Sequence, residues 1–301
     1  MSTVLIVEDD EAIAQGVRDN LEFEGHHVLV ACNGEIALRM VQAAERDGTL
    51  KPGDTILEPS SGNTGIGLAL VARLKGYGLR VVLPENVSEE RRQLLEIFGA
   101  EVIPSPGEEG SNGAIRVAEK LAADDPSLVM LFQYGNPANP DAHYSTTGPE
   151  ILRDCPEIDV FVAGLGTSGT LMGVGRYLKE HKPEVRVVAV EPPAGELVQG
   201  LRSLDDGFVP PIFRPELLDR KFIVRPRESI EWTRRLLDEC SIFAGISSGA
   251  IVAGAAKMAA TMDAGTIVTF SPDGGWKYLS SGAWTEDIDV VAERAKLINY
   301  W

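Results

Sequence analysis

Four short loops of glycine and hydroxyl residues constrain the fold of this 301-residue chain more than any other feature. Each follows an apolar, strand-like segment and opens a helix or a further loop; they cover residues 60–65, 164–170, 245–250 and 273–280. A strand, a small-residue turn and a helix start leave backbone N–H groups free to bind an anion such as phosphate or carboxylate. The same residue types are also ordinary helix caps, so a single loop leaves both interpretations open.

Apolar strand patterns and helix patterns alternate along most of the chain. The predicted strands cover residues 55–58, 80–84, 101–103, 129–132, 160–163, 186–190 and 266–270. Helices are predicted between them, for example at 89–98 and 113–123, and the polar, turn-rich residues 140–149 are predicted to be a crossover. Right-handed crossovers place the carboxyl ends of parallel strands on one side. We therefore predict an α/β fold of two doubly wound lobes whose four loops converge on one cleft.

Composition excludes several classes of protein. The hydrophobic share of 44% and charged share of 24% are ordinary for a soluble globular chain. A net charge of −17 argues against binding nucleic acid through phosphate neutralisation. No apolar run is long enough to cross a membrane, and the N-terminus shows no secretion signal. Cys32, Cys155 and Cys240 have no disulfide or metal-ligand spacing, so a cytoplasmic protein without a metal is expected.

The four loops, in this order and spacing, resemble the pyridoxal-phosphate enzymes of the cysteine synthase family over about residues 36–285. The closest resemblance is to its O-phosphoserine sulfhydrylase (cysteine synthase B) branch. It implies the tryptophan-synthase-β-like fold, fold type II, with a small lobe at 36–140 and a large lobe at 141–301. The implied activity is β-replacement on O-phosphoserine or O-acetylserine, with a sulfur donor, to give L-cysteine. In the O-phosphoserine branch that donor is a small thiocarboxylated carrier protein, and the family is commonly homodimeric.

The resemblance assigns the cofactor contacts. The loop at 166–170 matches the cup for the 5′-phosphate of pyridoxal phosphate, and Ser247 matches the hydroxyl that faces the pyridine nitrogen. Glycines let the backbone close on a dianion, and hydroxyls add donors without a fixed positive charge. A tight turn without a ligand, and a simple helix cap at Ser247, are the alternatives. The cup residues are Gly166, Thr167, Ser168, Gly169 and Thr170.

The resemblance also assigns the substrate contacts. The loop residues that match the substrate-carboxylate site are Ser60, Ser61, Asn63 and Thr64, with Asn63 also near the 3′-oxygen of the cofactor. Gln133 matches a residue that helps to hold the same carboxylate. Arg202 matches the arginine that binds the substrate's phosphate in the O-phosphoserine branch, for which a bidentate guanidinium is suited. An ordinary surface arginine is the alternative.

The lysine that the family chemistry requires is missing from its expected position. In the family this lysine forms a Schiff base with the cofactor's aldehyde and later moves protons. Aligning the helix that contains Arg39 places Asn33 there, 27 residues before Ser60, and an amide cannot form the imine. Lys51 and Lys75 offer no evident substitute. We therefore expect impaired turnover, with a non-catalytic cofactor-binding relative or a chimeric fusion as the alternative.

Residues 1–35 differ in character from the remainder. A strand at 3–7 ends in Glu8, Asp9 and Asp10, a helix pattern follows, and a second strand covers 27–31. This segment resembles the opening β-α-β of a response-regulator receiver domain and replaces the family's first strands. No phosphoacceptor aspartate can be placed, so a receiver-type signalling protein is the least supported reading. Asp9 and Asp10 are accordingly interpreted as surface or capping acids.

Overall fold

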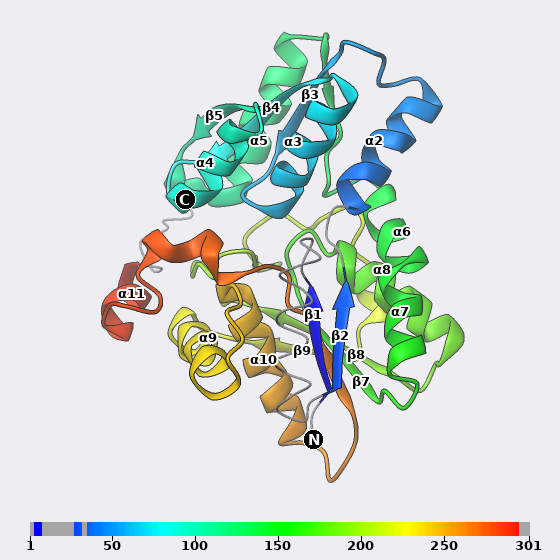
Figure 1. The fold of residues 1–301 in the computed structure, drawn as a ribbon, viewed down its shortest axis with the longest axis vertical. Helices are drawn as coiled ribbons and strands as arrows, with labels where there is room; N and C mark the ends of the chain where they lie inside the picture. The colour runs from blue at the N-terminus through cyan, green and yellow to red at the C-terminus, as the bar shows by residue number, and fades with distance from the viewer. Residues whose placement is uncertain (1–2, 8–26, 32–34, 295–301) are drawn as a thin grey trace.

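The computed structural model describes residues 3–7, 27–31 and 35–294, and it consists of helices and parallel β-sheets (Figure 1). Two strands, β1 (Thr3–Val7) and β2 (His27–Ala31), pair in parallel as a separate sheet, and β1 also contacts β10. Parallel pairing agrees with the predicted β-α-β order. The helix predicted between these strands, and the acids Asp9 and Asp10, lie outside the described residues.

The first large sheet has the strand order β5-β4-β3-β6, and every neighbouring pair is parallel. Its strands are β3 (Thr55–Pro59), β4 (Gly78–Pro84), β5 (Glu101–Ser105) and β6 (Leu128–Met130). Its helices are α2 (Glu35–Asp47), α3 (Asn63–Lys75), α4 (Glu89–Ile97) and α5 (Gly110–Asp124), with a 3₁₀ turn η1 (Gly107–Glu109).

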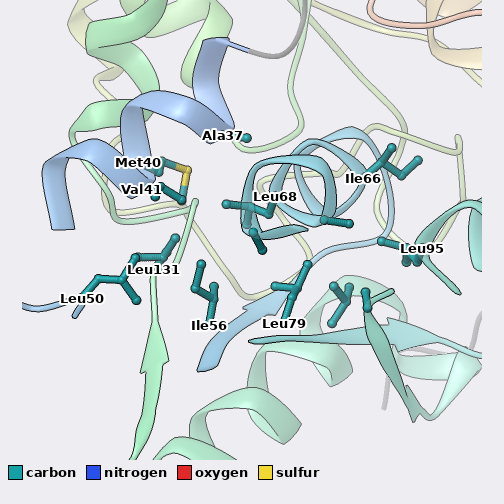
Figure 2. Close-up of a cluster of buried hydrophobic side chains, with 14 of the residues drawn as sticks. Ala37, Met40, Val41, Leu50, Ile56, Ile66, Leu68, Leu79, Leu95 and Leu131 are labelled. Atoms are coloured by element: carbon teal, nitrogen blue, oxygen red, sulfur yellow. The ribbon is translucent and has the colours of Figure 1, made fainter. Parts of the chain in front are cut away.

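Alternating strand residues direct the packing of this sheet, because successive side chains point to opposite faces. Ile56 and Val81 join a buried cluster with α2 and α3, of which Figure 2 shows a part around Met40. The next residue of each strand, Leu57 and Val82, joins a second cluster with α5. Helices thus cover both faces, as predicted for a doubly wound lobe.

The second large sheet has the order β10-β7-β8-β9, again with parallel neighbours. Its strands are β7 (Val160–Gly164), β8 (Arg186–Glu191), β9 (Arg220–Ile223) and β10 (Ile267–Thr269). The helical elements are α6 (Ala138–Ser145), α7 (Thr147–Asp154), α8 (Gly169–His181), η2 (Pro215–Leu217), α9 (Pro226–Cys240), α10 (Ile246–Ala259), η3 (Gly275–Ser281) and α11 (Ile288–Arg294). Phe161 and Val187 pack with α7 and α8, whereas Val162 and Val188 pack with α10.

Both sheets contain a point where the strand order reverses. In the first sheet the chain continues from β3 to β4 and β5 on one side, and β6 returns to the other side of β3. In the second sheet β8 and β9 lie on one side of β7, and β10 lies on the other. The loops that leave the carboxyl ends of the strands diverge at such points, and ligands bind in the resulting crevice. The loops after β3 and β7 are two of the four that dominate the sequence.

One expectation about local structure was wrong. Residues 140–149, predicted to be a turn-rich crossover, form most of α6 and the start of α7. The sequence of α6 shows no apolar stripe, because the residues that the helix buries include the polar Asn139 and His143, which are hydrogen-bonded. The helix packs close to α8 at Gly173. A side chain at Gly173 would place its Cβ 2.2 Å from the carbonyl oxygen of Pro140.

The strand β9 was not predicted because its sequence is polar. Arg220 and Lys221 are exposed at the edge of the second sheet, where a strand needs only one paired neighbour. In the ranges that the structure describes, no helix is long and apolar enough to cross a membrane.

Candidate active site

The predicted site residues come together in one pocket between the two large sheets. All of those that the structure describes line it: Ser60, Ser61, Asn63, Thr64, Gln133, Gly166, Thr167, Ser168, Gly169, Thr170, Arg202 and Ser247. Residues of the fourth loop, Asp273 and Tyr278, line the same pocket. The predicted convergence of the four loops on one cleft is therefore observed.

The cup at 166–170 is shaped by close backbone approach. A Cβ atom at Gly169 would lie 1.9 Å from Asn139 Oδ1, and one at Gly166 would lie 2.9 Å from the carbonyl oxygen of Gly200. Only glycine fits at these two positions without movement of a neighbour. Helix α8 starts at Gly169, whose N–H donates to Thr167 Oγ1 at 3.2 Å, and its first turn has no acidic residue, so the remaining N–H groups of that turn favour an anion.

Ser168 shows that the cup fits a phosphate group. It has φ of 75°, a left-handed conformation that is costly for a residue with a side chain. It is 2% exposed, and its Oγ has no hydrogen-bond partner within the described part of the chain. An unpaired buried hydroxyl beside a helix N-terminus is the environment that the 5′-phosphate of pyridoxal phosphate would complete.

His143, which was not predicted as a site residue, lies within hydrogen-bond distance of the cup residue Thr170. Its Nε2 lies 3.0 Å from Thr170 Oγ1 and its Nδ1 lies 2.9 Å from Thr147 Oγ1. Burial lowers the pKa of His143 to about 4, so the ring is neutral at pH 7. When Nε2 carries the proton it donates to Thr170, which leaves the Thr170 hydroxyl free to donate into the cup.

The loop after β3 is fixed by contacts with both lobes. Ser60 Oγ accepts the backbone N–H of Gly65 at 3.0 Å, which closes the turn. Asn63 donates to the carbonyl oxygen of Pro272 at 3.0 Å and accepts a hydrogen bond from Lys277 at 2.9 Å. Asn63 therefore links the start of α3 to the fourth loop. Its amide keeps one N–H that these two contacts do not use.

Gln133 is fixed by the strand that precedes the same loop. Its backbone N–H donates to Glu58 Oε1 at 3.0 Å, and its side chain donates to the carbonyl oxygen of Pro59 at 3.0 Å. Glu58 is fully buried, and burial raises the pKa of its carboxyl group to about 8. At pH 7 Glu58 is therefore mostly neutral, which is the form that a dry interior stabilises.

Arg202 lies in the pocket with one donor unused. Its guanidinium carbon is 4.9 Å from the ring centre of Tyr134 and 4.8 Å from that of Phe208. Its Nη2 donates to Asn112 Oδ1 at 2.8 Å. The residue is 9% exposed, and Nη1 has no partner among the residues described. A buried cation with a free donor is suited to an anionic ligand.

Ser247 lies at another part of the pocket wall, near the fourth loop. Gly200, whose φ is 93°, lies close to both Ser247 and Tyr278. A Cβ atom at this glycine would be 3.3 Å from Ser247 Oγ and 3.9 Å from the Tyr278 hydroxyl. That hydroxyl donates to Asp273 Oδ2 at 2.7 Å. Polar side chains thus gather around Ser247, which is buried at the start of α10.

Four polar residues in or beside the site were not predicted from the sequence: Arg91, Asn112, His143 and Glu58. Arg91 is buried, lines the pocket and donates to the carbonyl oxygen of Ser61 at 2.6 Å and to Gln199 across the lobe junction. For Glu58 the sequence did contain a signal, because this acidic residue lies within an apolar strand, directly before the turn at Pro59 and Ser60. The other three are polar residues on helices, where nothing in one sequence separates them from surface positions.

No lysine is among the residues described as lining the pocket. The start of α2 reaches the pocket through Ile36 and Ala37. Asn33, predicted to occupy the lysine position, lies outside the described residues, shortly before this helix. Lys277 contacts a pocket residue: its amine donates to Asn63 Oδ1 at 2.9 Å and lies 4.9 Å from the ring centre of Trp276.

Comparisons of the sequence and of the structure with known proteins all indicate the same family. The sequence model of the pyridoxal-phosphate dependent enzymes matches residues 32–273. Cysteine synthase of Staphylococcus aureus is 44% identical over 262 residues, which cover 84% of each chain. The solved structure of O-ureido-L-serine synthase matches with a TM-score of 0.77 and 40% identity, covering 86% of both chains. A lysine-to-alanine mutant of that enzyme, with O-ureido-L-serine bound, matches with a TM-score of 0.79 and 39% identity, covering 86% of this chain and 84% of the other.

The chain therefore belongs to the family of pyridoxal-phosphate dependent enzymes, which use pyridoxal 5′-phosphate as cofactor. Within that family it is cysteine synthase-like, and the predicted fold class, family and cofactor are confirmed. The family match begins at residue 32 and so leaves out most of the receiver-like segment. The receiver resemblance, and the lobe bounds at 35 and 140, stay predictions.

Proposed function

We propose that this chain binds pyridoxal phosphate and O-phospho-L-serine in the pocket, and that its chemistry is cysteine synthase-like β-replacement with severely impaired turnover. The free Nη1 of buried Arg202 is the observation that supports an anionic leaving group. The absence of a lysine from the described pocket lining, together with Asn33 in the sequence, supports the impairment.

The proposed cofactor contacts combine the geometry of the cup with the family resemblance. Residues 166–170 and the start of α8 would hold the phosphate of the cofactor, with His143 orienting Thr170. Ser247 would face the ring nitrogen. When bound, the cofactor supplies the electron-withdrawing ring that makes loss of a β-substituent from an amino acid feasible.

The substrate contacts would come from the loop after β3, from Gln133 and from Arg202. Ser61, Thr64 and Gln133 would orient the carboxylate, with Ser60 closing the turn behind them. Arg202 would bind the leaving phosphate and neutralise its charge as it departs. Without an amine at position 33, the described pocket lining holds no lysine to take the α-proton and return it, so the chain binds better than it turns over.

The remaining parts of the proposal come from the family resemblance. They are a thiocarboxylated carrier protein as sulfur donor, a homodimer and a cytoplasmic location. A non-catalytic cofactor-binding role is the second candidate, and the missing lysine favours it. The bound O-ureido-L-serine in the lysine-to-alanine relative is compatible with either candidate, since that variant retains a ligand.

Replacing Arg202 with alanine tests the substrate class. With pyridoxal phosphate present, calorimetry should show wild-type protein binding O-phospho-L-serine roughly 10- to 100-fold more tightly than O-acetyl-L-serine, as charge-assisted hydrogen bonds allow. R202A should remove this preference. R153A, which changes an exposed arginine paired with Asp154, is the control and should keep it. A wild-type protein without the preference would exclude O-phospho-L-serine as the substrate.

A further inference from the structure

Asn112 joins the two lobes through contacts at both ends of its amide. It lies in the first turn of α5, on the first sheet's side of the pocket. Its Oδ1 accepts a hydrogen bond from Arg202 Nη2 at 2.8 Å, and its Nδ2 donates to the carbonyl oxygen of Asp206 at 2.9 Å. The carboxylate of Asp206 accepts the backbone N–H of Gly195 at 3.0 Å, so its charge is directed away from the amide.

These contacts determine which guanidinium donor is free. The rings of Tyr134 and Phe208 lie against Arg202, and they meet each other edge to face at 5.6 Å. With the planar group held against these rings, Asn112 accepts from one terminal nitrogen, and Nη1 stays buried without a partner in the part of the chain that the structure describes. A buried donor without an acceptor destabilises the structure, so this orientation is favourable when a ligand supplies the acceptor.

The start of α5 adds donors to the same place. Gly110 and Ser111 line the pocket beside Arg202, and the 15-residue helix has no acidic residue in its first turn and no side-chain cap. The N–H of Gly110 donates to the carbonyl oxygen of Gly107, so the backbone N–H groups of Ser111 and Asn112 are the ones that this helix start leaves for an anion. The helix terminus alone would not define a site. Arg202 provides the independent observation, because its free donor is nine-tenths buried in the same pocket.

We propose that Asn112 is a positioning residue for anion specificity: it holds Nη2 of Arg202 so that Nη1 and the N-terminus of α5 together bind the phosphate of the substrate. This inference rests on the proposed function and extends it to the other lobe. An uncharged residue is required, because a carboxylate at position 112 would pair with Arg202 and cancel the charge that the ligand needs.

Two substitutions and one control test this role by calorimetry, with pyridoxal phosphate present. N112A should weaken binding of O-phospho-L-serine roughly 10-fold, as expected for one lost charge-assisted hydrogen bond. N112D should weaken it to the level of R202A. Binding of O-acetyl-L-serine should stay within about twofold in both variants, because neutral ligands do not use the charge. K120A, an exposed change on the same helix, should alter neither affinity.

The outcomes separate this inference from the proposed function. If N112A and N112D weaken both ligands equally, Asn112 only joins the lobes and the inference is overturned. If R202A removes the phosphate preference but both Asn112 variants keep it, the inference fails while the proposed function stands. If wild-type protein shows no preference, both fail together. Thermal unfolding of each variant confirms that the measured protein is folded.

Discussion

Replacing Asn33 with lysine should raise the rate of cysteine formation roughly 10²- to 10⁴-fold, the range that a positioned acid–base group contributes. A lysine amine can bond to the aldehyde of the cofactor and then carry a proton between substrate atoms. The other parts of the site are in place, since the cup, the loop after β3 and Arg202 share one pocket. The measurement is cysteine production from O-phospho-L-serine and sulfide, with and without added pyridoxal phosphate.

N33R is the matched control for this gain. Arginine adds the same positive charge on a side chain of similar length, but its guanidinium does not lose its proton near pH 7 and cannot take the role of the amine. An increase with N33K and none with N33R would support the missing-lysine account. Equal rates for N33K and the unmodified chain would refute the assignment of position 33.

Glu58 should make the folded chain less stable as the pH rises. Its pKa is about 8 when folded and near the ordinary 4.5 when unfolded, so the unfolded chain loses this proton at lower pH. The folded state therefore binds more protons between these values, and the free energy of unfolding falls across that window. One pKa unit corresponds to about 1.36 kcal/mol, so the full loss is on the order of 5 kcal/mol once the pH passes the folded pKa.

Urea unfolding at pH 5 and at pH 8.5 measures this effect. E58Q keeps an acceptor for the backbone N–H of Gln133 and cannot ionise, so its free energy of unfolding should fall much less between the two pH values. E119Q, an exposed change on α5, should retain the wild-type slope. Parallel curves for E58Q and wild-type protein would show that Glu58 does not ionise in this range.

Much of the fold could be predicted because apolar strand segments and polar turn segments alternate along the sequence. Val81 and Val82 illustrate the point: each is apolar, and together they require a strand buried on both faces. The four loops identified the site because glycine is required where backbones meet, as at Gly169. The helix α6 was missed because hydrogen bonds to buried polar groups, rather than an apolar stripe, hold it in place.

The supporting residues of the site could not be predicted for a related reason. Asn112, His143 and Arg91 act through partners that are distant in sequence: His143 is 27 positions from Thr170, and Arg202 is 90 positions from Asn112. A single sequence carries no signal for such pairs. Arg202 was found only because its local context resembles a known family, and its free donor became visible only in the structure.

The most direct test of this account is the absorption of cofactor retained by the purified chain after dialysis, with and without prior borohydride reduction. We expect saturable binding of one pyridoxal phosphate per chain that dialysis removes, and no stoichiometric cofactor fixed by borohydride. Failure to bind the cofactor would contradict the assignment of the pocket. One cofactor per chain fixed by borohydride would show that an amine occupies the site after all.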